Sequence, residues 1–340
     1  IHIEFLNKQN IIKDKKFQQL SVKKNFTFVD LFSGAGGFSL GLKMSGLKHI
    51  YGVDSWVMAS KTYSKNIGFN ICKDLQVLKP VKLSIKVDIL VGSPPCQSFS
   101  LANRRNSNTS EGVSLYLSFL DYLKFYKPKV FVLENVFGLL SFKKNKDIKV
   151  IDEMIQAFSI EYHVRVFKIC CSDFGVPQKR KRVLIIGVQK DFGEYFPDLK
   201  KSPCKVNLRS LLLSKKEVSK DFFLSKKALS GILRRQIINR KKGNGFGAHY
   251  LNLDSFCNTI TANYWKDGYS SLIKYNETTI RRLTELELKR VQSFPDTFNF
   301  SGSKKEKYIQ IGNAVPPKLA YFIGKEIIKF LEKDISENEK

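Results

Sequence analysis

The sequence lacks a hydrophobic run long enough to cross a membrane, and residues 1–25 lack the continuous apolar core of a signal peptide. A membrane-spanning helix requires about 20 mostly apolar residues, and a secretory signal requires a shorter apolar core behind a basic start. With 43% hydrophobic and 26% charged residues, the composition predicts a globular cytoplasmic protein with no membrane partner. At 340 residues, the chain can bury one large domain and a smaller one.

The cysteines lack the spacing of a metal site. None of the six forms a Cys-x-x-Cys pair, and the vicinal pair Cys170-Cys171 does not match zinc-ligand spacing. A disulfide framework is not expected in a chain of this length without a secretion signal. We therefore expect reduced thiols and no metal.

Acidic residues are scarce, with 31 Asp and Glu against 58 Lys and Arg, which gives a formal net charge of +27. An anionic partner is implied, and nucleic acid is the first candidate. Between Lys200 and Lys242 the chain carries 14 basic residues against Glu217 and Asp221, so this segment contributes +12. The alternative is a solvated basic face without a ligand.

One cysteine follows a rigid turn. The apolar run Val87 to Val91 predicts a strand, and Gly-Ser-Pro-Pro leads from it to Cys96. Two prolines fix the backbone before the thiol, and catalytic groups collect at the carboxyl ends of strands in open α/β sheets. The alternative is an ordinary buried loop cysteine, which is the common state of that residue type.

A second turn is rich in glycine. Phe26 to Phe32 predicts a strand, and Ser33 to Gly37 follows it as Ser-Gly-Ala-Gly-Gly before a helix. Such a strand–turn–helix unit lets a nucleotide-like ligand approach the backbone, although Ser39 occupies the third glycine position of the dinucleotide fingerprint. Asp54, 20 residues beyond Gly34, ends the next apolar run and suits two ribose hydroxyls. A helix N-cap explains the same spacing.

Charged residues mark the ends of two further predicted strands. Lys129 to Leu133 predicts a buried strand of the parallel type with Glu134 at its tip. A carboxylate there requires a partner if buried, or else caps the next segment at the surface. Gln178, Arg180 and Arg182 alternate before the apolar run Val183 to Val188, so an extended backbone points them to one side.

Helix signals complete the pattern. Tyr116 to Tyr126 predicts a helix that ends before Lys127-Pro128, and Thr284 with Glu287 forms a capping box that starts another. Two more helices are expected to bury one apolar face each. Their apolar positions are Ile148, Ile151, Met154, Ile155 and Phe158, and Leu319, Phe322, Ile323, Ile327 and Phe330.

Together the motifs resemble those of the cytosine-C5 DNA methyltransferases of bacterial restriction-modification systems. The resemblance covers roughly residues 26–190 and 275–331 in the family's usual order. It rests on Asp30 to Gly37, Pro94 to Ser100, Glu134 to Val136, Gln178 to Arg182 and Gly312 to Ala314. It implies an α/β fold, a doubly wound, mostly parallel sheet of the S-adenosylmethionine-dependent methyltransferase type, with a second, smaller, mainly β recognition domain.

The resemblance also implies roles for individual residues. Cys96 is the expected nucleophile at cytosine C6, Glu134 holds the ring nitrogen and amino group, and Arg182, supported by Arg180, neutralises charge at O2. The residues implied at S-adenosylmethionine are Phe32, Gly34, Ala35, Gly36, Gly37, Asp54, Asp74, Leu75, Pro94, Asn313 and Ala314. Those expected at DNA are Gln97, Arg104, Arg105, Lys241, Lys242, Thr259 and Ile260.

The expected domain plan divides the chain into five segments. They are a basic arm over 1–25, the catalytic domain over 26–195, a target-recognition domain over 196–274, the rest of the catalytic domain over 275–331 and a charged tail over 332–340. We expect a monomer that acts on double-stranded DNA, with a cognate restriction endonuclease acting on the same site without direct contact. The arm is either a DNA backbone contact or a frayed terminus.

Two relatives of the same superfamily are the alternatives. One is a tRNA cytosine-C5 methyltransferase, for which the expected Cys-Phe-Thr mark is replaced by Cys257-Asn258-Thr259. The other is a catalytically silent DNA-binding relative, against which the intact Cys96 and Glu134 argue. Enzymes that methylate amino groups require Asp/Asn-Pro-Pro-Tyr/Phe, which Ser93 to Cys96 does not match.

Overall fold

The computed structural model describes residues 26–95, 109–143, 148–192, 195–201, 207–241, 243 and 247–338. Its centre is a seven-stranded sheet in the order β3-β2-β1-β4-β5-β8-β6. The strands are β1 (Thr27–Leu31), β2 (Lys48–Asp54), β3 (Asn70–Cys72), β4 (Ile89–Gly92), β5 (Val130–Val136), β6 (Tyr162–Cys170) and β8 (Lys181–Gln189). All neighbours pair in parallel except β8, which is antiparallel to β5 and β6. The predicted doubly wound, mostly parallel sheet is confirmed.

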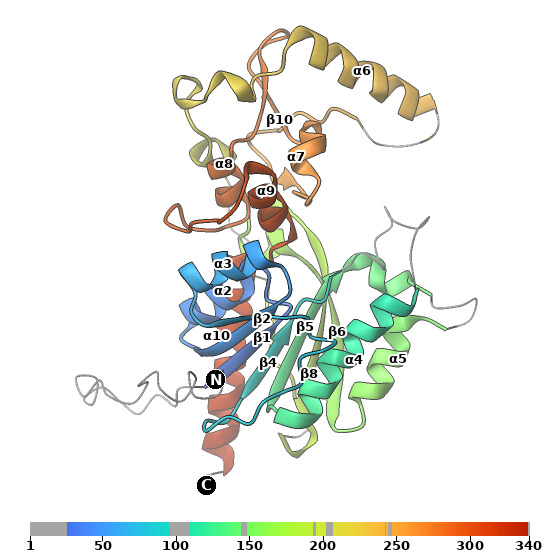
Figure 1. Ribbon diagram of the computed structural model, residues 1–340, viewed down its shortest axis with the longest axis vertical. Helices are drawn as coiled ribbons and strands as arrows, with labels where there is room; N and C mark the ends of the chain where they lie inside the picture. The colour runs from blue at the N-terminus through green and yellow to red at the C-terminus, as the bar shows by residue number, and fades with distance from the viewer. Residues whose placement is uncertain are drawn as a thin grey trace, which may run out of the picture.

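Helices cover both faces of this sheet (Figure 1). On one side lie α2 (Gly37–Ser45), α3 (Val57–Asn66) and α10 (Pro317–Asn338), and on the other lie α4 (Thr109–Tyr126) and α5 (Val150–Phe158). The strands supply both cores by alternation: in β5, Val130 and Val132 join the core with α2 and α10, while Phe131 and Leu133 join the core with α4 and α5.

The helix ends follow backbone chemistry. Gly46 closes α2 with φ 110°, a left-handed conformation that glycine adopts without a steric penalty. The predicted end of α4 before Lys127-Pro128 is confirmed. The prediction for Ile148 was wrong, because it precedes α5 and is 41% exposed. Helix α4 also begins seven residues before the predicted start at Tyr116. The sequence did not indicate these first turns because they lack an apolar stripe.

The elements between residues 207 and 313 form a separate layer above the carboxyl edge of the sheet (Figure 1). They are η6 (Leu208–Leu211), η7 (Lys215–Glu217), η8 (Lys220–Phe222), α6 (Lys226–Lys241), β9 (Cys257–Asn258), α7 (Tyr264–Asp267), η9 (Gly268–Ser270), β10 (Leu272–Lys274), β11 (Ile280–Arg282), α8 (Glu285–Val291) and α9 (Lys304–Asn313). This layer contains less strand than we expected: β9, β10 and β11 have two or three residues each, and α6 has 16.

Four short elements adjoin the ends of the sheet strands. They are η3 (Phe137–Ser141), η4 (Cys171–Phe174), β7 (Gln178–Lys179) and η5 (Lys190–Phe192). Strand β7 pairs in parallel with β9, so the two layers share a small ladder. Among the described ranges, no helix has both the length and the apolar character of a membrane span.

Candidate active site

The turns singled out in the sequence meet at one edge of the sheet. Strand order reverses between β1 and β4, which makes this the point where open α/β sheets bind their ligands. The glycine turn leaves β1 and the Pro-Pro turn leaves β4. The end of β5 and, because β8 runs antiparallel, the beginning of β8 lie at the same edge. The fold thereby gathers residues that are up to 150 positions apart in the sequence, as from Phe32 to Arg182.

The glycine turn combines backbone strain with open space. Phe32 and Gly34 both have φ 53°, a conformation that is costly for a side-chain-bearing residue. A Cβ on Gly34 would meet no atom within 4 Å, whereas a Cβ on Gly37 would lie 2.2 Å from the carbonyl oxygen of Val315. Gly34 therefore faces an opening, and Gly37 is packed against the turn before α10.

Asp54 ties the glycine turn to the next helix. Its Oδ2 accepts from the backbone N–H of Gly34 (2.8 Å) and its Oδ1 accepts from that of Trp56 (2.8 Å). Burial raises the pKa of this carboxyl, and the two N–H groups partly oppose the rise. The helix N-cap considered for Asp54 falls instead to Trp56.

A buried polar chain lies beneath the glycine turn. Ser39 Oγ is 2.5 Å from both Asp30 Oδ2 and Tyr63 Oη, and Tyr63 Oη is 2.8 Å from His49 Nε2. Burial raises the pKa of Asp30 to about 7, and burial lowers the pKa of His49 to about 3, with a further lowering by Lys43. The turn thus rests on groups whose protonation is set by burial.

The Pro-Pro turn is fixed from two sides. The backbone N–H of Ser93 donates to the carbonyl oxygen of Leu31 (3.2 Å), and Asn135 Nδ2 donates to that of Pro94 (3.4 Å). Pro94 is buried. Cys96 lies outside the described residues, so its assignment as nucleophile stays a prediction, but the residues that lead to it are anchored to β1 and β5.

Glu134 has the partner that its burial requires. Glu134 Oε1 and Arg182 Nε are 2.8 Å apart, and their side chains are 7% and 11% exposed. Arg182 Nη1 also donates to the carbonyl oxygen of Lys181 (2.7 Å). A carboxylate and a guanidinium held together with little water are arranged to bind a flat polar group through charge-assisted hydrogen bonds.

The alternation of Gln178, Arg180 and Arg182 toward one buried side is confirmed, since they are 0%, 2% and 9% exposed. Their partners differ, however. Gln178 Oε1 accepts from the backbone N–H of Ile260 (2.8 Å), and Arg180 Nη1 donates to the carbonyl oxygen of Ile260 (2.9 Å). Arg180 therefore holds the upper layer, whereas Arg182 pairs with Glu134.

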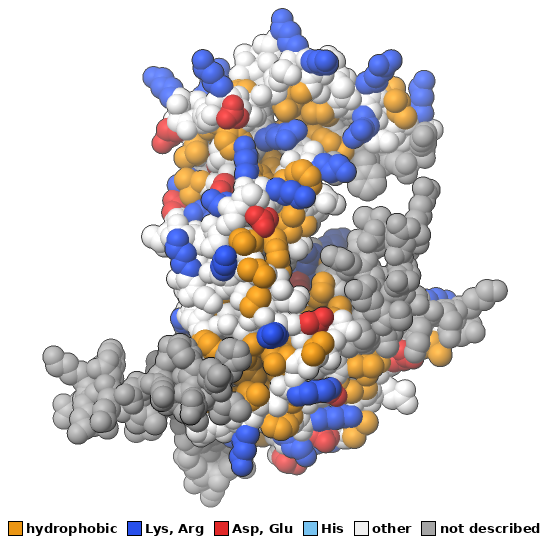
Figure 2. All heavy atoms as spheres, in the orientation of Figure 1, with side chains coloured by type: hydrophobic (Ala, Val, Ile, Leu, Met, Phe, Trp, Pro, Cys, Tyr) orange, Lys and Arg blue, Asp and Glu red, His pale blue; other side chains and the backbone are white. Residues whose placement is uncertain are grey.

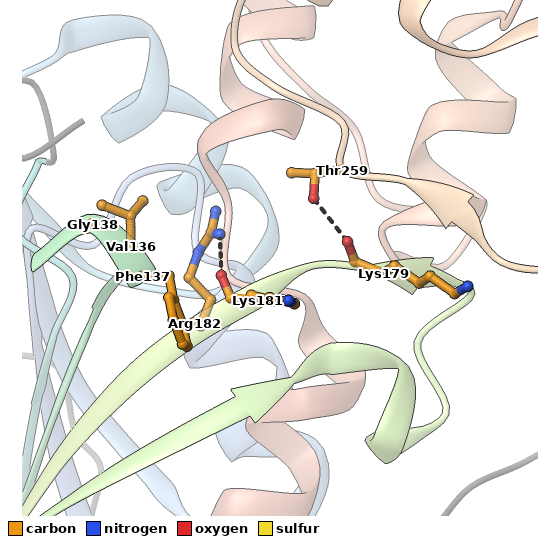
Figure 3. Close-up of a pocket in the computed structure, with 7 residues that line it drawn as sticks. All are labelled: Val136, Phe137, Gly138, Lys179, Lys181, Arg182 and Thr259. Atoms are coloured by element: carbon orange, nitrogen blue, oxygen red, sulfur yellow. Dashed lines mark hydrogen bonds between the residues drawn. The ribbon is translucent and has the colours of Figure 1, made fainter. Parts of the chain in front are cut away.

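A pocket of about 340 Å³ opens beside this pair (Figure 3). It is lined by the end of β5, the start of η3, the β7–β8 segment and one residue of the upper layer. These residues are Val136, Phe137, Gly138, Lys179, Lys181, Arg182 and Thr259. Thr259 Oγ1 donates to the carbonyl oxygen of Lys179 (2.8 Å), which fixes it at the rim.

The remaining predicted residues fall into three groups. Leu75 and Ala314 are buried, while Asp74 and Asn313 are exposed. The side chain of Ile260 is fully buried, which differs from the DNA contact predicted for it. Lys241 is exposed at the last turn of α6. Outside the described residues lie Gln97, Arg104, Arg105 and Lys242.

Two buried residues that support the site from outside it were not predicted. Asn135, next to Glu134, holds the Pro-Pro turn, and nothing in its sequence neighbourhood marks that role. Gln292 is fully buried and contacts Gln178 (3.0 Å) and Ile311 (2.6 Å). Its signal was a polar residue four positions after Leu288, on the apolar side of a predicted helix.

Comparisons with known proteins agree with this geometry. A type II methyltransferase, M1.ScrFI of Lactococcus lactis subsp. cremoris, is 32% identical over 311 residues, which cover 91% of this chain and 79% of the relative. The type II methyltransferase M.HpaII of Haemophilus parainfluenzae is 29% identical over 329 residues and covers 92% and 91%. The solved structure of the Dnmt2 methyltransferase of S. pombe has the same fold, with a TM-score of 0.67, 16% identity and coverage of 91% and 99%.

The family model described as C-5 cytosine-specific DNA methylase matches residues 26–329. That span includes every described strand of the sheet and all of the upper layer's described elements. The chain therefore belongs to the C-5 cytosine-specific DNA methylase family.

Proposed function

We propose that this DNA cytosine-C5 methyltransferase takes its methyl group from S-adenosylmethionine and acts on a cytosine flipped out of duplex DNA, as the modification enzyme of a type II restriction system. The observation that carries the proposal is the buried pair of Glu134 and Arg182 beside the Pro-Pro turn. The names of the relatives support the type II assignment.

The residues present fit S-adenosylmethionine. The open side of Gly34 leaves room for a ligand to approach the backbone, and Asp54 at the end of β2 offers carboxylate oxygens to ribose hydroxyls. We expect the cofactor also to contact Phe32, Ala35, Gly36, Leu75 and Ala314. Phe32 packs against the apolar cluster that contains Leu75, and Ala35 shares a cluster with Ala314. When bound, the cofactor supplies the methyl group. The chain's own part is to orient it toward the Pro-Pro turn.

The chemistry then requires activation of the cytosine ring. C5 is a poor nucleophile, so the Cys96 thiolate adds to C6 and places electron density on C5. Glu134 accepts from the amino group and shares a proton with ring N3, which makes C6 more electrophilic, and Arg182 neutralises charge that develops at O2. After the methyl group reaches C5, a base such as an ordered water removes the C5 proton and the thiolate leaves. Because C6 is inaccessible within a duplex, the base must leave the helix.

The upper layer is suited to hold DNA. Figure 2 shows Lys and Arg side chains gathered over the upper part of the molecule, where Figure 1 draws α6 to α9. Helix α6 has no buried residue, and Lys227, Arg234 and Lys241 recur every seven positions, so they follow one exposed line about 10 Å apart. Phosphates are the ligands that such a line fits.

A covalent trap tests the chemical assignment. With 5-fluorocytosine at the target position, addition and methyl transfer proceed, but elimination would require the loss of fluorine as a cation. We expect a protein–DNA adduct that survives a denaturing gel, requires S-adenosylmethionine and disappears in Cys96→Ser. An adduct that maps to Cys72 or Cys170 would contradict the assignment of Cys96, and no adduct at all would indicate a silent DNA-binding relative.

The RNA-directed alternative has a distinct outcome, which is an adduct with fluorinated tRNA and none with duplex DNA. The environment of Cys257 argues against this thiol as the nucleophile with either nucleic acid. Cys257 is fully buried and donates to Ser271 Oγ (3.6 Å), and burial raises the pKa of its thiol to about 12. A thiol in that state is a poor nucleophile.

The line of basic residues on α6 is tested by salt. If it contacts phosphates, log Kd changes with log salt by about 0.9 per neutralised phosphate, and the double variant Arg234→Ala/Lys241→Ala lowers the slope by nearly 2. The matched control is Lys82→Ala/Lys86→Ala, which removes two exposed charges before β4 at the opposite edge of the sheet. Equal slopes of log Kd against log salt in the two variants would show that the basic line on α6 is an ordinary solvated face that does not contact phosphates.

A further inference from the structure

The upper layer touches the sheet through a chain of buried amides. The backbone N–H of Ile260 donates to Gln178 Oε1 (2.8 Å), and Gln178 Nε2 donates to Gln292 Oε1 (3.0 Å). Gln292 Nε2 donates in turn to the carbonyl oxygen of Ile311 (2.6 Å). Both glutamine side chains are fully buried. Every hydrogen bond therefore runs in the same direction, from the residue just after β9 through β7 and the end of α8 to α9.

This relay begins where a strand ladder stops. Strands β7 and β9 pair over only two residues each, Gln178 with Cys257 and Lys179 with Asn258. At Ile260 the side chains of Gln178 and Arg180 take over, one accepting from its N–H and the other donating to its carbonyl. The side chains thus continue the ladder for a residue that has no strand partner.

The end of the relay at α9 also contacts the backbone that follows Ile260. A Cβ on Gly312 would lie 2.4 Å from the carbonyl group of Thr261, so α9 packs directly against the chain just after Ile260. Because Gln292 bonds the carbonyl oxygen of Ile311, one residue before Gly312, the relay sets the position of α9 as well. Residues 259–262 are held between β7 and α9.

The clamped segment carries a residue of the pocket. Thr259 lines the pocket together with Lys179 and Arg182 (Figure 3), and it directly precedes Ile260. A shift of Ile260 would carry Thr259 along, away from the rim opposite Arg182. Unpaired amides in a buried site are costly, so the relay has only one arrangement that satisfies all its groups, and that arrangement fixes the rim.

We infer that Gln292 is a positioning residue, acting through Gln178, that holds Thr259 and Ile260 at the rim of the pocket and thereby sets the affinity and sequence fidelity for DNA without entering the chemistry. The inference rests on the proposed function. Gln292 is too deeply buried to contact DNA, and it bonds neither Glu134 nor Arg182. Its effect on the reaction must therefore pass through the backbone it holds.

The test compares Gln292→Met with Gln310→Met in the full-length protein. Gln310 is the matched control because it is a glutamine of similar burial, 2% exposed, on α9. Its two hydrogen bonds, with Thr62 and Ser301, lie outside the relay. Both variants should lose similar thermal stability. Only Gln292→Met should raise the KM for DNA, by about tenfold, and lower the preference for the cognate site over a single-mismatch site, with kcat at saturating DNA and affinity for S-adenosylmethionine within about twofold.

Coupling to Gln178 provides the second readout. If Gln292 acts through Gln178, the KM of Gln178→Met/Gln292→Met should equal that of Gln178→Met alone. If the two residues act independently, the fold-increases in KM of the two single variants should multiply. Should Gln292→Met not fold, Gln292→Glu keeps the length of the side chain and the acceptor for Gln178 and should raise the KM by a smaller factor. An unchanged KM and fidelity in a folded variant, or multiplying effects, would overturn the inference. Failure of the proposed function would look different, since the unmodified protein would then not methylate cytosine.

Discussion

The sheet and the upper layer differ in how regular their elements are and in what joins them. In the sheet, β1, β4 and β5 bury almost every side chain, and alternate residues of each strand enter different cores. In the upper layer, an apolar cluster holds α7, α8 and α9 together, but α6 buries none of its residues, the strands are two or three residues long, and buried polar contacts join several of the short pieces. Where short pieces are joined by buried polar contacts, the loss of a single partner leaves an unsatisfied group, so the upper layer depends more on individual polar residues than the sheet does.

The first prediction tests the active site, which lies where the sheet meets the upper layer. Glu134→Gln keeps the size of the side chain but removes the charge that pairs with Arg182, so the fold should persist and kcat should fall by roughly 10²–10⁴. Single-turnover methylation at saturating DNA measures it. Glu161→Gln is the control, because Glu161 is a partly exposed acid of the same type just before β6. Equal rates in both variants would exclude Glu134 from the chemistry.

The second prediction concerns the upper layer alone. Arg281 and Glu287 form a fully buried bidentate pair, with both nitrogen–oxygen distances 2.8 Å. Glu287 also accepts from the backbone N–H groups of Leu213 and Thr284. Arg281→Met leaves the carboxylate without its partner and should lower the free energy of unfolding by about 3–5 kcal/mol.

Urea unfolding measures this loss, and two further variants interpret it. Arg209→Ala breaks an exposed pair with Asp254 and should change stability by less than about 1 kcal/mol. Arg281→Met/Glu287→Leu removes both charges and should recover much of the loss. If the single and double variants are equally unstable, the packing of Arg281, and not its charge, organises the layer.

The same contrast explains what the sequence revealed. Phe26 to Leu31 and Val130 to Leu133 are mostly apolar, as strands buried on both faces are. A glycine turn follows β1 and a Pro-Pro turn follows β4, so the sheet and its functional edge were predictable. The resemblance to a known family then supplied the roles of Cys96 and the cofactor residues. These assignments stay predictions, although the structure brings Glu134, Arg182 and the Pro-Pro turn to one edge.

The rest depends on contacts between distant residues. Nothing local distinguishes Arg180 from Arg182, yet one holds Ile260 and the other Glu134. Ile148 has the apolar character and spacing of a core residue, but the helix begins two residues after it. In the upper layer, the 3-10 turns and short strands have no period for the sequence to display, so a mainly β layer was expected and α6 was missed.

The third prediction sharpens the comparison inside the sheet, where polar groups are also buried. The pKa of Asp30 is raised from 3.8 to about 7 in the folded protein, so its contribution to stability is full below pH 3.8 and is lost as the pH rises through 7. The pKa of His49 is lowered from 6.5 to about 3, so its contribution is full above pH 6.5 and is lost as the pH falls toward 3. Between about pH 4 and 6.5 the two effects oppose each other.

Removing one group should therefore expose the other. His49→Gln can keep a hydrogen bond to Tyr63 and should become less stable as the pH rises from 4 to 7, by up to about 1.4 kcal/mol per pH unit. Asp30→Asn should show the opposite slope between pH 3 and 6.5. Chemical denaturation across this range measures both, and a flat profile for each variant would show that neither group titrates with folding.

The smallest expected change in stability is at Gly34, and it separates the needs of the fold from those of the ligand. Gly34→Ala introduces a Cβ at φ 53° that meets no atom within 4 Å. The only cost is therefore backbone strain, which should lower the free energy of unfolding by about 1 kcal/mol. Gly37→Ala must displace the backbone at Val315, 2.2 Å from the new Cβ, and should lose more. If the opening at Gly34 receives S-adenosylmethionine, the Gly34 variant alone should combine near-normal thermal stability with affinity weakened by about tenfold or more. Calorimetric titration with S-adenosylmethionine measures the affinity. An unchanged affinity in the Gly34 variant would show that the cofactor does not bind at this turn.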